Sequence, residues 1–284
     1  MRTHPFLPAC YFAALLFPCS CTKHAGQPVP PVTNKPFLVF NAMQYQGMPD
    51  LTGQGLRNVN LINETSLFTS SEAETPDSAK IAALGTQASG EPGIPVIFDI
   101  EAWPYTGSGL QATIDSFLEV IRVFKQTDTG AMGFYGVVPN DADTWENIEP
   151  AGGANYVRWQ QLNTALTPIA DKIDLFFPSF YTHDNDTTSW SDFVTATLGE
   201  LQKYNVHKPV YAFLWPQYHD GSPDQYQFLD TNVWKFELKT LFPLVDGIVI
   251  WSSSKTTLGV SNEWSDSASW WIVTEAFMAE HQIN

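Results

Sequence analysis

Residues 94–103 read IPVIFDIEAW, and we base the fold assignment on this stretch. Its run of β-branched and aromatic residues predicts a buried strand. Side chains alternate along a strand, so Ile97, Asp99 and Glu101 share one face while Phe98 and Ile100 point to the other. The apolar face can pack against helices, and the two acids then lie together where the strand ends.

Seven short β-rich runs of this kind occur along the chain, and helical patterns separate most of them. Strands that alternate with helices indicate a parallel sheet. An open doubly wound sheet would need a glycine-rich turn after its first strand, and PFLVFNAMQYQG at 36–47 has none. We therefore expect an α/β fold, a distorted TIM-like (β/α) barrel of about seven parallel strands, as one domain over residues 36–284. The expected strands are Phe37–Ala42, Arg57–Ile62, Pro95–Ile100, Ala131–Val138, Leu175–Ser179, Pro209–Leu214 and Gly247–Trp251, and the expected helices lie near 76–89, 110–124, 155–170, 189–204, 229–242 and 265–281.

Aromatic and polar residues follow the ends of the other expected strands. In a barrel these ends meet at one face, where active sites form. Sugar rings stack their C–H faces on aromatic side chains and need polar partners for their hydroxyls. We therefore predict a sugar-binding cavity here, whereas Trp234, Trp270 and Trp271 lie in helical patterns and are expected in the core. The predicted substrate-binding residues are Tyr135, Ser179, Tyr181, Trp215, Gln217, Tyr218, Asp220 and Trp251.

Asp99 and Glu101 are the candidate catalytic pair. Two neighbouring acids in a poorly hydrated cavity cannot both ionise easily, so the pKa of one rises. A carboxyl group that stays protonated near neutral pH is what a glycosidase needs to protonate its leaving group. We assign this role to Glu101, which lies nearer the mouth, and expect Asp99 to stay charged.

The N-terminal segment predicts export. Residues 1–21 combine Arg2, an apolar run over 6–18 and the sequence Cys19-Ser20-Cys21, which is typical of a secretory or bacterial lipoprotein signal. Cys21 is the preferred lipidation site and Cys19 the alternative. Residues 22–35 form a proline-rich linker. We expect a secreted or periplasmic protein, or one displayed at the cell surface, anchored by lipid to a bacterial outer membrane.

Charge and composition exclude several classes of partner. The net charge is −16, which disfavours nucleic acid and anionic membranes, so membrane contact is expected only through the lipid anchor. No two of the six histidines have metal-ligand spacing, and no GxSxG nucleophile motif occurs. We expect no metal, no cofactor, a monomer, and a polysaccharide or oligosaccharide as partner.

Together these motifs resemble the hyaluronidase family of glycoside hydrolases. FDIEAW at 98–103 is similar to the family's acid motif, GFYG at 133–136 and FPSFY at 177–181 to two of its tyrosine strands, GIVIW at 247–251 to its tryptophan strand, and PFLVFNA at 36–42 to its opening strand. The resemblance implies a distorted barrel and a retaining mechanism assisted by the substrate's 2-acetamido group. It also implies that Tyr181 belongs to the catalytic site, that Tyr135 lines the acetamido pocket, that Trp251 closes it, and that Trp103 corresponds to the tryptophan of the acid motif and contacts substrate.

The chain departs from the family in ways that leave the substrate open. The family's cysteines are absent, and Asp-Ile-Glu replaces Asp-Trp-Glu. We therefore expect a glycan that contains N-acetylhexosamine, either hyaluronan-like or neutral. Two alternatives remain: a chitinase-like or lysozyme-like hydrolase with the same DxE strand, and a surface lipoprotein that binds glycans without cleaving them.

Overall fold

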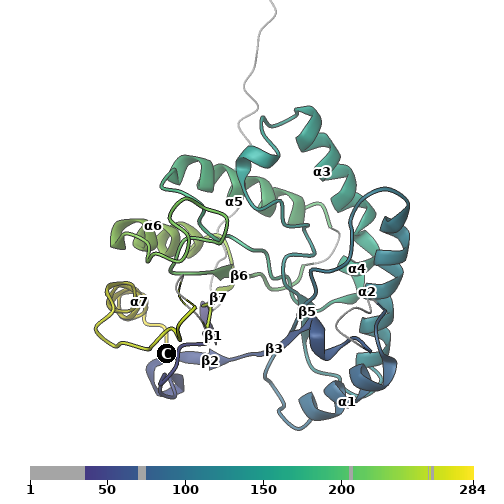
Figure 1. Ribbon diagram of the computed structural model, residues 1–284, viewed down its shortest axis with the longest axis horizontal. Coiled ribbons are helices and arrows are strands. Elements are labelled where there is room, and N and C mark those ends of the chain that lie inside the picture. The colour runs from purple at the N-terminus through teal and green to yellow at the C-terminus, as the bar shows by residue number, and fades with distance from the viewer. Residues whose placement is uncertain (1–35, 70–74, 205–206, 255, 257–258) are drawn as a thin grey trace, which may run out of the picture.

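The computed structural model describes residues 36–69, 75–204, 207–254, 256 and 259–284. The expected signal (1–21) and linker (22–35) lie outside these residues. Within them the chain is an α/β barrel, as predicted, and the helices follow one another around the strands (Figure 1). The strands are β1 (Leu38–Ala42), β2 (Leu56–Asn58), β3 (Asn60–Asn63), β4 (Val96–Asp99), β5 (Met132–Phe134), β6 (Tyr211–Leu214) and β7 (Gly247–Trp251).

Parallel pairing joins these strands in the orders β2-β1-β7-β6 and β3-β4-β5. Residues 175–179 connect the two sheets, because Phe177 bridges to Tyr135 after β5 and Ser179 bridges to Phe213 in β6. On the other side the sheets are joined by the chain itself, since β2 and β3 are separated only by Val59. Strand pairing on one side and this chain connection on the other thus arrange the strands as a distorted barrel.

Three predicted strands differ from the structure. The strand expected over 131–138 is the much shorter β5, Met132–Phe134. The run expected over 57–62 is divided, because its first part pairs with β1 and its second with β4. The run expected over 175–179 forms isolated bridges and no continuous strand. Pro178 lies in its middle and has no N–H to donate to a ladder.

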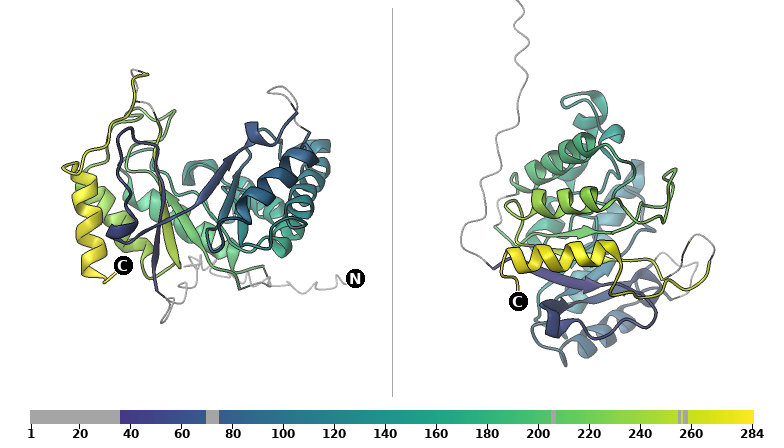
Figure 2. Two further views of the ribbon diagram at one scale, coloured as in Figure 1. Left: turned by 90° about the horizontal axis from the view of Figure 1, so that it is seen from below. Right: turned by 90° about the vertical axis from the view of Figure 1, so that its left-hand side faces the viewer.

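The helices lie outside the strands, with α6 and α7 on the side opposite α1 and α2 (Figure 2). The one helix expected over 155–170 is two, because Pro168 begins a new helix and cannot continue the previous one. The helices are α1 (Ser78–Ala88), α2 (Leu110–Phe124), α3 (Ala154–Ala165), α4 (Thr167–Lys172), α5 (Thr187–Leu201), α6 (Thr231–Leu241) and α7 (Ser269–Glu280).

The apolar residues form two clusters, as the alternation predicts. Ile97 belongs to the cluster inside the barrel, with residues such as Phe177 and Phe213. Phe98 and Ile100 belong to the larger cluster between strands and helices. The latter also contains Trp234, Trp270 and Trp271, which are fully buried as expected.

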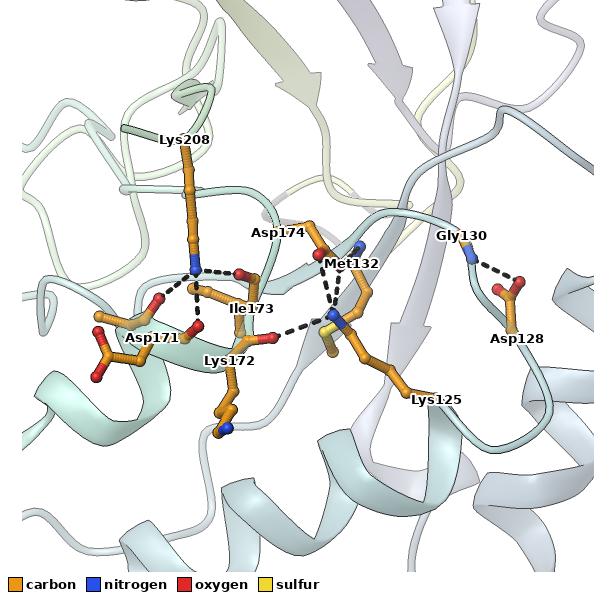
Figure 3. A network of polar contacts seen from close by, with 10 residues as sticks. Lys125, Asp128, Gly130, Met132, Asp171, Lys172, Ile173, Asp174 and Lys208 are labelled. Carbon is orange, nitrogen blue, oxygen red and sulfur yellow. Dashed lines mark hydrogen bonds and ion pairs between the residues drawn. The ribbon is translucent and has the colours of Figure 1, made fainter. Parts of the chain in front are cut away.

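A polar network joins the C-terminal ends of α2 and α4 to the start of β5 (Figure 3). The Lys208 ammonium donates to the backbone carbonyls of Ala170, at 2.6 Å, of Asp171 and of Ile173, and so caps the C-terminal end of α4. Lys125, at the end of α2, donates to Asp174 Oδ1 at 2.9 Å. The Oδ2 atom of Asp174 accepts from the first N–H of β5 at 3.1 Å. These bonds fix α2 and α4 relative to β5 at the end of the barrel where the strands begin.

Candidate active site

A cavity of about 300 Å³ lies where the strands end. Leu61 and Phe213 contribute to its walls from the strands, and the remaining lining residues come from strand ends and the loops beyond them. Most of the predicted site residues meet here, because the carboxyl ends of parallel strands converge on one face. The lining residues are Leu61, Asp99, Glu101, Tyr135, Tyr181, Phe213, Trp215, His219, Asp220, Tyr226, Trp251 and Ser253.

Asp99 and Glu101 lie side by side in this cavity at the end of β4. Burial raises the pKa of Asp99 to about 6; the charge of Glu64 adds to this effect, while a hydrogen bond from Asn63 opposes it. The Oδ1 atom of Asp99 is buried and has no hydrogen-bond partner among the described residues. Glu101 is more exposed, and its pKa is raised by partial burial and by the charges of Asp99 and Glu64. Asp99, which the sequence predicted to stay charged, is the more buried of the two acids. Its carboxylate therefore takes up a proton as the pH falls through about 6.

Aromatic rings line the side of the cavity. Tyr181, Trp215 and Trp251 are in mutual contact, with ring centroids 5.7 Å apart for Tyr181–Trp215, 5.8 Å for Tyr181–Trp251 and 4.7 Å for Trp215–Trp251. His219 stacks on Tyr181 at 5.5 Å. Such a wall presents flat apolar faces beside the acids, which is the surface that a sugar ring stacks on.

Three residues predicted to contact substrate lie elsewhere. Trp103 is 4% exposed and packs edge-on against Phe117 in the core between strands and helices. Gln217 is buried, and its Oε1 atom accepts from Trp215 Nε1 at 3.1 Å, so it supports the aromatic wall from behind. Tyr218 is buried in the outer core, and its hydroxyl donates to Asn185 Oδ1. These residues follow the strand ends in loops, where strand alternation no longer tells which way a side chain points.

The other two predicted residues lie at the edges of the site. Ser179 is buried, and its Oγ atom accepts a hydrogen bond from the Tyr135 hydroxyl at 3.2 Å. Asp220 lies on the cavity rim, and its exposed carboxylate is 3.1 Å from His219 Nδ1. Ser179 therefore holds the Tyr135 hydroxyl from behind the cavity wall, whereas Asp220 can contact a ligand at the mouth of the cavity.

Four site residues were not predicted from the sequence. His219 and Tyr226 line the cavity, and Tyr226 adopts a φ of 65°, a conformation that is uncommon outside glycine and is often found at functional sites. Glu64 accepts hydrogen bonds from the backbone of Glu101. Asp141 lies behind Tyr135, and burial together with the charge of Asp143 raises its pKa to about 7. Glu64 and His219 lie beside a strand end or a buried tyrosine, which is the signal that could have found them, whereas no such signal marks Tyr226.

The described residues contain no group of three or more His, Cys, Asp or Glu side chains that could hold a metal ion. Within the same part of the chain, no helix is long and apolar enough to cross a membrane.

Comparison with known proteins supports the fold. No family model matches the chain, and no curated protein matches it in sequence. Bee venom hyaluronidase superposes with a TM-score of 0.55 at 14% identity, over 77% of this chain and 91% of that one. The same enzyme in complex with a hyaluronic acid tetramer gives 0.56 at 14% identity, over 87% and 95%. An endo-β-1,4-mannanase from Thermotoga petrophila gives 0.47 at 14% identity, over 72% and 49%. The two superpositions on bee venom hyaluronidase show that the chain shares the TIM-barrel-like fold of that glycoside hydrolase.

Proposed function

We propose that this protein is a glycoside hydrolase that cleaves a glycan containing N-acetylhexosamine. The observation that carries the proposal is the placement of Asp99 and Glu101, both with raised pKa values, in a cavity walled by Tyr181, Trp215 and Trp251. Paired carboxyl groups beside a wall of aromatic rings suit the protonation of a glycosidic oxygen. The fold shared with bee venom hyaluronidase is consistent with this chemistry.

Glu101 is the proposed general acid. It donates its proton to the glycosidic oxygen as the bond from that oxygen to the anomeric carbon breaks. The carbonyl oxygen of the substrate's own 2-acetamido group forms the new bond from the opposite face. Glu101, now a carboxylate, then takes a proton from the water that opens the cyclic intermediate, and the anomeric configuration is retained.

The positions of the acids support this substrate-assisted route. Asp99 is the last residue of β4 and Glu101 follows it by two residues, and both line the same cavity, so they approach a sugar from the same side. A nucleophilic carboxylate would have to lie about 5 Å or more away across the sugar ring. Among the described lining residues only Asp220 is a further acid, and it lies at the exposed rim. Asp99 and Tyr181 are instead assigned to hold the acetamido group.

The charges around the cavity favour a neutral glycan over hyaluronan. The described residues that line the cavity include the acids Asp99, Glu101 and Asp220 and no lysine or arginine. A carboxylate on every second sugar would be repelled by these groups. A neutral oligosaccharide of N-acetylhexosamine meets no such cost.

Three measurements test the proposal. A panel of N-acetylated polysaccharides, neutral and acidic, is incubated with the protein and its products are analysed by mass spectrometry. A thiazoline that mimics the cyclised intermediate should inhibit strongly, since analogues of high-energy states bind far more tightly than substrates. Proton NMR of the first turnovers should show retained configuration. An inverted product, or efficient cleavage of a glycan without 2-acetamido groups, contradicts the mechanism, and intact sugar after long incubation favours a binding protein.

The proposal includes an N-terminal lipid anchor at Cys21, with Cys19 as the alternative site. The full-length chain produced in bacteria should incorporate labelled fatty acid and partition into detergent, because two or more acyl chains hold a protein stably on a membrane. Labelling that persists in Cys21→Ser indicates that Cys19 is the lipidated residue, and an unlabelled wild type indicates secretion without an anchor.

A further inference from the structure

His219 lines the cavity, and neighbouring rings hold its imidazole in place. The ring stacks on Tyr181 with centroids 5.5 Å apart, meets Trp215 edge-to-face at 5.8 Å, and lies 4.6 Å from the ring of His183. The backbone N–H of His219 donates to the carbonyl of Thr182 at 2.8 Å. The side chain remains 26% exposed, so it is fixed on several sides and is still accessible to a ligand.

The contacts of the ring determine which of its nitrogen atoms carries the proton. The Nδ1 atom of His219 lies 2.8 Å from the backbone carbonyl oxygen of Asp220 and 3.1 Å from the Oδ1 atom of the same residue. A carbonyl oxygen and a carboxylate oxygen can only accept, so Nδ1 must be the atom that bears the hydrogen. A neutral imidazole has one N–H, which leaves a lone pair on Nε2. No hydrogen bond within the described part of the chain uses Nε2, so this lone pair is available to a ligand.

An acceptor at Nε2 complements the aromatic wall beside it. Tyr181 and Trp215 offer flat faces that hold a sugar ring but do not distinguish one hydroxyl group from another. A fixed acceptor makes this distinction, because a hydrogen bond requires a donor at a defined distance and angle. Every hydroxyl group of a sugar can donate, whereas an ionised carboxylate can only accept. The imidazole of His219 is therefore suited to a sugar that carries a hydroxyl group at this place.

We propose that His219 is a substrate-binding residue that determines specificity, with its Nε2 atom accepting a hydrogen bond from a hydroxyl group of a neutral sugar that lies against Tyr181 and Trp215. The inference rests on the proposed function and deepens it. The general acid Glu101 lines the same cavity, so the sugar that is contacted is one that flanks the bond to be cleaved. A uronic acid with its carboxylate at this place would leave Nε2 without a donor and would be repelled by Asp220.

The test compares His219→Phe with His219→Gln and uses His183→Phe as the matched control. Phenylalanine keeps a ring against Tyr181 and removes both nitrogens, whereas glutamine supplies an amide oxygen that can accept in place of Nε2. His183 contacts the same imidazole and does not line the cavity. On a neutral N-acetylhexosamine oligosaccharide that the wild type cleaves, His219→Phe should lose about threefold to tenfold in kcat/KM. His219→Gln should recover part of this loss, and the control should keep the wild-type value.

Deoxygenated sugars separate a lost hydrogen bond from a structural effect. The hydroxyl groups are removed one at a time from the neutral N-acetylhexosamine oligosaccharide that the protein binds most tightly in the panel, and the dissociation constants are measured by titration calorimetry. One deoxy analogue should bind the wild type about threefold to tenfold more weakly than the parent sugar does. The same analogue should cost His219→Phe nothing further, because the partner of that hydroxyl group is already absent.

Nitrogen-15 NMR of the histidine side chains tests the tautomer without any sugar. At about pH 8 the signals of His219, assigned by their absence from His219→Phe, should show a proton on Nδ1 and none on Nε2. Four results overturn the inference: a proton on Nε2, deoxy analogues that each cost the wild type and His219→Phe the same factor, an equal loss in His183→Phe, or a wild type that binds no neutral oligosaccharide of the panel. If the expected pairing appears in binding but the sugar is not cleaved, the inference holds and only the proposed function fails.

Discussion

Glu64 holds the backbone of Glu101 in place: its Oε2 atom accepts a hydrogen bond from the Glu101 N–H at 2.8 Å, and a second from the next N–H at 2.9 Å. Glu64 follows β3, which pairs directly with β4. A third acid therefore fixes the point from which the Glu101 side chain enters the cavity. Its charge also raises the pKa values of Glu101 and Asp99, so it influences both the position and the protonation of the catalytic pair.

Two substitutions of Glu64 should separate these effects. Glu64→Gln keeps an oxygen that accepts from both N–H groups but removes the charge. We expect kcat to be largely retained, and the alkaline limb of the pH profile to move to lower pH because the pKa of Glu101 falls. Glu64→Ala removes the acceptor as well, and kcat should fall about tenfold or more as the backbone of Glu101 loosens. Identical profiles for the wild type and Glu64→Gln contradict the electrostatic role.

Glu101→Gln should nearly abolish turnover. Glutamine has the same shape and cannot donate the proton, and general acid catalysis supplies about 10²–10⁴-fold. Asp99→Asn should also be severe, because the acetamido group loses its charged partner. Glu119→Gln, on the exposed face of α2, is a matched control that should leave kcat/KM unchanged. Near-normal activity in both active-site variants, measured on correctly folded protein, means that other groups carry the chemistry.

The sequence was informative wherever strand alternation held. Ile97 faces the barrel interior while Phe98 packs against helices, and Asp99 and Glu101 reach the cavity, because a two-residue period determines these directions. Tyr135, Tyr181 and Trp251 meet them because the ends of parallel strands converge. These predictions needed no knowledge of loop paths.

Beyond the strand ends the sequence does not predict which way side chains point or which residues they contact. Trp103 is only two residues from Glu101, yet its ring turns into the outer core, where Phe117 of α2 fills the space beside it. Asp141 lies six residues after Tyr135 and returns to it through a tight turn. Glu64 reaches Glu101 across 37 residues. Such contacts depend on how loops fold back, which composition and periodicity do not determine.

Lys208 should contribute to stability and leave catalysis unaffected. Its ammonium satisfies three carbonyls at the end of α4, on the side of the barrel away from the cavity. Lys208→Met keeps most of the apolar stem and removes these bonds, which should lower the free energy of unfolding by about 1–3 kcal/mol in urea denaturation. Lys239→Met, which breaks an exposed pair with Glu280, should change the free energy of unfolding far less, because solvent screens this pair. Equal losses in the two variants contradict a special role for Lys208.

Glu237 should behave as a neutral residue. It is 1% exposed on α6, its Oε1 atom accepts from the Thr182 hydroxyl, and burial raises its pKa far above the ordinary value. Glu237→Gln replaces one neutral acceptor by another and should change the free energy of unfolding by less than about 1 kcal/mol. Glu237→Leu leaves Thr182, which adjoins Tyr181, without its partner and should cost about 1–3 kcal/mol and reduce kcat. A large loss in Glu237→Gln indicates a charged carboxylate.

The raised pKa values make the protein most stable in mildly acidic solution. Asp99 and Asp141 titrate at about 6 and about 7 in the folded protein, against 3.8 as the ordinary value. Between these limits the folded state holds protons that the unfolded state has released, so the free energy of unfolding falls as the pH rises from about 4 to about 7 and then levels off. The melting temperature should accordingly be higher near pH 5 than near pH 8.

Removing either charge should flatten this dependence. Asp99→Asn and Asp141→Asn eliminate the cost of ionising a buried acid, which is on the order of a few kcal/mol. Each should raise the melting temperature at about pH 8 and change it little at about pH 5, as measured by circular dichroism. Asp50→Asn is the control with the opposite sign: Asp50 is exposed, and hydrogen bonds from Thr52 lower its pKa, so this substitution should not stabilise the protein at pH 8. Two results together would contradict raised pKa values for these buried acids. They are a wild-type melting temperature that rises from pH 5 to pH 8, and variant melting temperatures equal to those of the wild type. In Asp99→Asn the expected gain in stability accompanies a loss of activity, because the buried carboxylate that is costly to ionise is the one assigned to hold the acetamido group.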